Sequence, residues 1–106
     1  MDITRLKETI QRKKSLDIND DFAIAECWNI ETEILSNDIN GAINFIQTCS
    51  EEEYYELAEV FPEIIDKTQS HELYNAMWKR NESLCNQEYK ESNMTDLKYA
   101  QEALSH

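Results

Sequence analysis

Glycine and proline are almost absent from this chain of 106 residues, which contains one of each, Gly41 and Pro62. Short β-strands need tight turns with positive φ, which glycine or asparagine usually supplies. Helices joined by short connections can instead turn through Ser, Asn and Asp caps. The scarcity of glycine and proline therefore predicts an all-α protein. We expect a compact bundle of roughly five to seven short helices in antiparallel hairpins.

Long apolar runs are also missing. No stretch approaches the ~20 apolar residues that a membrane-crossing helix needs, and the mean hydropathy is −0.71. The N-terminal segment is charged and lacks the apolar core of a secretory signal. Three cysteines, an odd number without CxxC spacing, fit free thiols in a reducing compartment. We therefore expect a cytoplasmic protein that makes no membrane contact.

The patterns that carry catalysis or bind cofactors are absent as well. A single glycine cannot build a glycine-rich phosphate loop. The segment Asp17–Asp21 begins like a calcium loop, but Phe22 stands where a glycine turn is needed and Trp28 where a bidentate glutamate is needed. The histidines are His71 and His106, so a nucleophile paired with histidine would have to use His71. We expect no catalytic residue, no metal and no cofactor.

Apolar residues at helical spacing predict where the helices lie. We expect helices at about 3–14, from about 21, after Ser36, after Ser50, after Ser70 and from Thr95, with a polar loop over 86–93. These form one domain, 1–106, with a basic N-terminal helix (1–14), an acidic helical region (15–66) and C-terminal helices (67–106). Core positions are predicted for Phe22 and Trp28 of the second helix, and core or core-edge positions for Cys27, Cys49 and Cys85.

The clearest helix boundary is Ser50-Glu51-Glu52-Glu53, a capping box in which Ser50 and Glu53 bond to each other's backbone amides. Pro62 lacks an amide hydrogen and predicts a kink or a restart of the helix near Phe61. Gly41 falls inside the predicted third helix, where glycine costs about 1 kcal/mol relative to alanine. Close packing against a neighbour would explain it.

Charge is the most uneven property of the chain. Ten basic residues stand against 22 acidic ones, giving a formal net charge of −12. Residues 1–14 hold five basic and two acidic residues, whereas residues 15–66 hold fourteen acidic residues and no Lys or Arg. Such a surface cannot bind a nucleic-acid backbone directly. Repulsion among the crowded carboxylates should raise their pKa values.

A field of one sign opposes folding, so it either serves solubility or complements a basic partner. We expect the second, with a nuclease, a basic DNA-binding regulator or a basic peptide as the partner. Tyr55, Tyr74 and Trp78 are candidate aromatic anchors on this surface. The expected contacts are first Glu52, Glu56 and Glu59, from one helix face with Tyr55, and second Asp17, Asp20, Asp21, Glu31 and Glu33.

Four segments, ETEILSNDIN at 31–40, SEEE at 50–53, LAEVF at 57–61 and DKTQS at 66–70, resemble small helical proteins of bacterial polymorphic-toxin loci. These include immunity proteins of contact-dependent growth inhibition systems. The likeness covers roughly residues 31–80 and rests on capping and apolar positions. The chain after about Asn81 departs from the family.

The resemblance implies a cytoplasmic protein that binds and neutralises a cognate toxin domain, often a nuclease. The charge distribution agrees with that expectation because an acidic inhibitor would occupy the positive groove in which a nuclease holds its substrate. Two other classes stay open. One is an acidic regulatory adaptor or nucleic-acid mimic that binds a basic DNA-binding protein, and the other is an enzyme using carboxylates or His71.

Overall fold

The computed structural model describes residues 1–105, and His106 lies outside the described residues. All regular structure in the described chain is helical, as the scarcity of glycine and proline predicts. The elements are α1 (Ile3–Ser15), α2 (Asp21–Ser36), α3 (Ile39–Thr48), α4 (Glu51–Leu57), the 3-10 turn η1 (Ala58–Val60), α5 (Phe61–Thr68), α6 (His71–Ser83) and α7 (Gln87–Ala103). No helix within these residues combines the length and apolarity needed to cross a membrane.

Side-chain caps begin most of these helices. Asp2, Asp20 and Asp38 accept from backbone amides in the first turns of α1, α2 and α3. Ser50 and Glu53 form the predicted capping box of α4. Ser70 caps α6 and Asn86 caps α7 in the same way. The chain therefore turns at capped helix ends, and its one backbone position with positive φ among residues 1–105 is Gln69, at the end of α5.

Gly41 is explained by the cap of its own helix. A Cβ atom at Gly41 would lie 2.8 Å from the Asp38 carboxyl carbon, and Asp38 Oδ1 accepts from the Gly41 amide at 2.9 Å. The expected packing against a neighbouring element is therefore wrong. Glycine at this position leaves room for the capping carboxylate.

The predicted restart at Pro62 is present. The chain passes from α4 through η1 into α5, and Pro62 occupies the first turn of α5, where its missing amide hydrogen removes no helical bond. Phe61, Ile64 and Ile65 of α5 are fully buried. This short helix packs against both α2 and α7, so it joins the two sides of the core.

The loop predicted over 86–93 is wrong, because α7 is continuous from Gln87 to Ala103. Most of its polar residues face solvent, but Asn93 is buried and donates to Asn81 Oδ1 at 3.0 Å. The Glu51 carboxylate accepts from the backbone amides of Cys85 and Asn86 at 2.9 to 3.1 Å. These contacts from α4 and α6, together with the packing of Leu97 and Ala100 in the core beside α5, hold a helix whose first half has little apolar periodicity.

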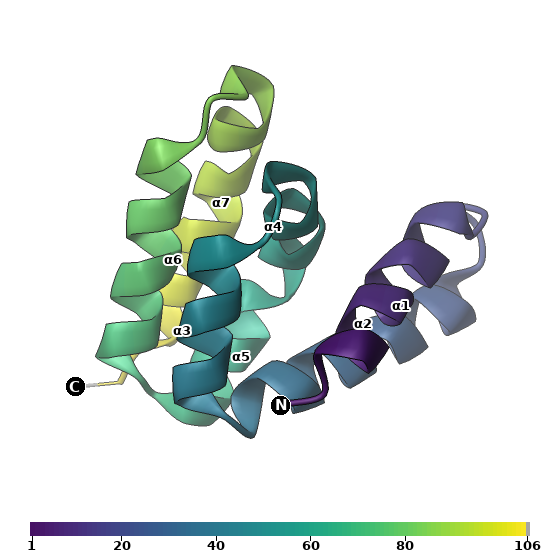
Figure 1. Ribbon diagram of the computed structural model, residues 1–106, viewed down its shortest axis with the longest axis horizontal. Coiled ribbons are helices and arrows are strands. Elements are labelled where there is room, and N and C mark those ends of the chain that lie inside the picture. The colour runs from purple at the N-terminus through teal and green to yellow at the C-terminus, as the bar shows by residue number, and fades with distance from the viewer. Residues whose placement is uncertain (106) are drawn as a thin grey trace.

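The hairpin of α1 and α2 lies to one side of the other helices in Figure 1. The buried face of α2 contains Cys27, Glu31, Ile34 and Leu35. This helical phase leaves Phe22 85% exposed and Trp28 40% exposed, so their predicted core positions are wrong. Cys27 and Cys49 are buried as expected, whereas Cys85 is exposed in the connection before α7.

Tyr54 is the largest fully buried side chain, and its ring lies 5.3 Å from that of Phe61, centroid to centroid. Its hydroxyl donates to the Met77 carbonyl at 2.7 Å, so it joins α4 to α6. Buried neutral hydrogen bonds contribute about 1 kcal/mol to stability.

We predict that Tyr54→Phe lowers the free energy of unfolding by about 1 kcal/mol in urea denaturation. Tyr99→Phe is the matched control, because Tyr99 is 55% exposed on α7. The control should leave the unfolding midpoint unchanged. Equal midpoints for both variants would show that the Tyr54 hydroxyl has no structural role.

Candidate partner-binding groove

The three glutamates that the sequence places first among the contacts lie against the basic last turn of α1. Lys14 forms an ion pair with Glu52. Lys13 Nζ lies 2.7 Å from Glu59 Oε1 and donates to the Glu56 carbonyl at 2.6 Å. The cations next to this acidic face therefore belong to the chain's own N-terminal helix, and the basic segment 1–14 and the acidic segment 15–66 pair with each other.

Lys13 is buried, with its side chain 5% exposed, and its third partner is Glu31 Oε1 at 2.9 Å. Glu31 is fully buried, so its predicted role as a surface contact is wrong. Glu31 Oε2 has no hydrogen-bond partner among the described residues. Helical phase explains the burial, since Glu31 follows Cys27 by one turn on the face of α2 that meets α1 and α5.

Burial raises the pKa of Glu31 to about 7, against the opposing effect of Lys13. Burial alone would lower the pKa of Lys13, but Glu31 and Glu59 outweigh it and leave that pKa raised. Both pKa values are raised because one ammonium group faces two carboxylates. The ammonium keeps its charge, and the more deeply buried carboxylate is the one that holds its charge least easily.

Beside this cluster, α1, α2, α4 and η1 enclose a groove of about 690 Å³. Its apolar lining includes Ile18, which is 84% exposed, and Trp28. Three of its charged lining residues are acids that the sequence singled out, Asp21, Glu56 and Glu59. The remaining lining residues are Lys13, Lys14, Leu16, Ile24 and Ala25. Asp21 of the second set of predicted contacts thus meets Glu56 and Glu59 of the first set at one groove, although Asp21 and Glu56 are 35 residues apart in the chain.

The other predicted contacts have different surroundings. Asp17 and Asp20 are exposed in the connection between α1 and α2, where each accepts from a backbone amide. Glu33 is exposed on α2 and does not line the groove. Tyr55 is half-buried, and its ring stacks on that of Tyr89 with centroids 4.2 Å apart. Tyr55 is therefore engaged within the fold, and the aromatic ring in the groove is Trp28.

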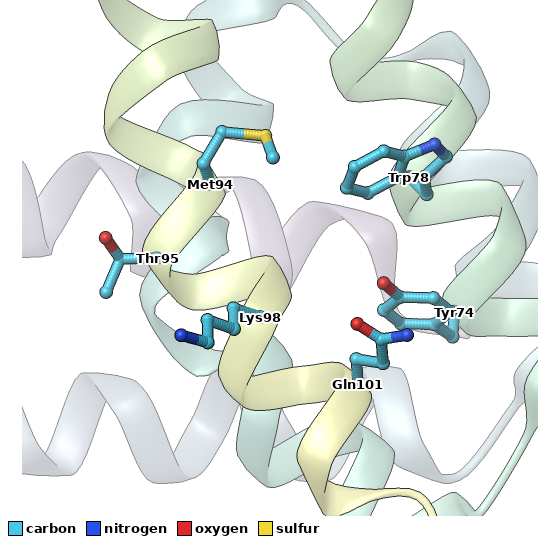
Figure 2. A pocket seen from close by; sticks show the side chains of 6 residues that line it. All are labelled: Tyr74, Trp78, Met94, Thr95, Lys98 and Gln101. Carbon is cyan, nitrogen blue, oxygen red and sulfur yellow. The ribbon is translucent and has the colours of Figure 1, made fainter.

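Tyr74 and Trp78, the other candidate anchors, line a separate pocket of about 440 Å³ between α6 and α7. Figure 2 shows both rings on α6, opposite Met94 and Gln101 of α7. The charged side chain in this lining is Lys98. These aromatics are thus not brought to the acidic surface, contrary to expectation.

Crowding of carboxylates affects pKa values less than expected. The pKa of Glu56 and that of Asp96 are raised chiefly by burial, and Glu59 adds a smaller repulsion to each. Glu51 and Asp38 accept from backbone amides, which lower their pKa values. Within residues 1–105, no group of acidic, histidine or cysteine side chains is arranged to hold a metal ion.

Comparison of this chain with known protein families, with curated proteins and with solved structures finds no match.

We predict that Lys13→Met lowers the free energy of unfolding by about 2–3 kcal/mol at pH 8, because the buried Glu31 loses its counter-ion and must take up a proton on folding, and the Glu56 carbonyl loses its donor. Lys14→Met is the matched control, since Lys14 pairs with the half-exposed Glu52. Urea denaturation at pH 8 should show a small change for this control.

The double variant Lys13→Met with Glu31→Leu should recover most of the loss, because no buried carboxyl group then has to take up a proton on folding. A double variant as unstable as Lys13→Met alone would contradict the electrostatic explanation. It would assign the loss to packing of the lysine stem instead.

Proposed function

We propose that this protein is an immunity protein that binds and neutralises a cognate toxin domain, a basic nuclease, through the groove between α1, α2 and α4. The proposal rests on one observation: exposed apolar side chains and carboxylates line the same groove. The apolar side chains are Ile18 and Trp28, and the carboxylates are those of Asp21, Glu56 and Glu59. Interfaces are commonly anchored by an aromatic side chain at their centre with polar groups around it.

The charges around the groove support a cationic partner. No ion pair to Asp17, Asp20 or Asp21 is present within residues 1–105. Asp21 lines the groove, and Asp17 and Asp20 are exposed in the same connection as the lining residue Ile18. The field of these carboxylates attracts a positively charged surface and repels nucleic acid. A protein seated on the positive active groove of a nuclease would exclude the substrate phosphates from it.

The apolar lining favours an inhibitor over a mimic of nucleic acid. A mimic needs only a series of carboxylates, whereas this groove adds apolar side chains, Ile18 and Trp28 among them, that can receive a side chain of the partner. In this proposal the carboxylates speed and orient the encounter, and Trp28 and Ile18 supply most of the binding energy. Inhibition then requires no chemistry by the immunity protein itself.

The test begins with the gene directly upstream, which we expect to encode a large secreted toxin with a basic toxic domain. The purified domain should degrade RNA or DNA, and one equivalent of this protein should stop the degradation. Two results would contradict the proposal. One is a toxic domain that this protein neither binds nor inhibits, and the other is capture of a basic DNA-binding regulator without any toxin.

We predict that Asp21→Lys with Trp28→Ala weakens the complex by about 30-fold or more, measured by calorimetric titration. The matched control is Glu72→Lys with Trp78→Ala, because Glu72 is a first-turn acid of α6 and Trp78 is 37% exposed against 40% for Trp28. The control should bind as the unchanged protein does. Equal weakening by both variants would mean that net charge, and not the groove, determines binding.

A further inference from the structure

One ammonium group connects the groove to a carboxylate that lies beneath it. Lys13 lines the groove, and its Nζ contacts Glu59 Oε1 at 2.7 Å, Glu31 Oε1 at 2.9 Å and the Glu56 carbonyl at 2.6 Å. An ammonium has three hydrogens to donate, so these three acceptors use all of them. Any change in the charge of Glu31 therefore alters how Lys13 is shared with Glu59, which itself lines the groove.

Glu31 is the member of this cluster that holds a negative charge least easily. It is fully buried, one of its oxygens has no partner among the described residues, and it shares its ammonium with Glu59. The Glu59 side chain is 43% exposed and keeps water around its charge. The ionised cluster carries one excess negative charge, so the proton that removes it goes to Glu31. The pKa of about 7 for Glu31 agrees with this assignment.

Within the described chain, the helices packed around α2 bring no cation other than Lys13 close to the Glu31 carboxylate. Lys13 faces it from α1, while Glu56 of α4 and Glu59 of η1 oppose its charge. The thiol of Cys27 lies one turn earlier on α2 and is buried. The sequence of α3 has no charged residue, and the charged residues of α5, Glu63, Asp66 and Lys67, are exposed.

We propose that the groove is proton-gated through the Lys13, Glu31 and Glu59 cluster, with ionised Glu31 as the form that binds a basic partner. When Glu31 is ionised, Lys13 is divided between two carboxylates, and Glu59 retains negative charge for the partner. When Glu31 is protonated, Glu59 alone balances Lys13, and the groove loses one negative charge. Binding of a cationic partner then releases up to one proton. Below neutral pH its affinity falls by up to about tenfold per pH unit.

The binding role in this inference rests on the proposed function, but the protonation step belongs to the chain alone. Trp28 lines the same groove and reports on it through its indole fluorescence. Trp78→Phe leaves Trp28 as the only indole. Histidines as a class titrate in the same pH range, so His71→Gln and His106→Gln remove that contribution. In this background we expect Trp28 emission to change with a midpoint near pH 7.

Two further substitutions in this background identify the group. Glu31→Gln should abolish the transition, whereas Glu33→Gln, an exposed position two residues along α2, should leave it in place. In the unsubstituted protein, the side-chain carboxyl carbon of Glu31, assigned by NMR through its own backbone, should titrate with the same midpoint. The NMR titration determines the pKa of Glu31 even if the Glu31→Gln variant does not fold.

A Glu31 midpoint below about pH 5.5, or a Trp28 transition that survives in a folded Glu31→Gln variant, would overturn the proton gate. Either result leaves the proposed inhibitor function standing, since a groove without the gate can still bind a basic partner. Conversely, a toxin that fails to bind would refute the proposed function and leave the titration of Glu31 unchanged.

Discussion

The burial of the Lys13 ammonium between two carboxylates and a backbone carbonyl is the interaction on which the arrangement of this protein depends. The last turn of α1 supplies the cations that residues 15–66 lack. Lys13 follows Leu6 and Ile10 on the buried face of α1, so the same helical stripe that enters the core ends on a positive charge. An acidic region that would otherwise repel itself is therefore held to α1 by both apolar and ionic contacts.

This arrangement also determines what is left for a partner. Glu31 is buried within the fold and shares Lys13 with Glu59, whereas Asp17, Asp20 and Asp21 remain in solvent and Asp21 lines the groove. The helical phase that buries Glu31 is the one that turns Trp28 toward the groove. The orientation of α2 about its own axis therefore both buries Glu31 and places Trp28 in the groove. It also brings the proton on Glu31 close to the surface where we propose that a toxin binds.

Much of the local structure could be predicted from sequence, because it depends on residues close together in the chain. The capping box at Ser50, the restart at Pro62 and the all-α class follow from such short-range rules. The continuous α7 could not be predicted in this way. It depends on Asn93 meeting Asn81 and on Glu51 accepting from the start of the helix, and polar residues at those positions are equally typical of loops. The partnership of Lys13 with Glu31 spans eighteen residues and has no sequence signature.

If Lys13 is needed, beside the apolar residues, to hold α1 in place, hydrogen exchange of the α1 backbone amides under native conditions will show it. The account predicts that α1 amides in the unchanged protein exchange only with global unfolding. In Lys13→Met they should exchange much faster than the amides of α5 and α7, because α1 now opens by itself. Amides of α1 that stay as protected as those of α5 in Lys13→Met would contradict the account and assign the docking of α1 to Leu6 and Ile10 alone.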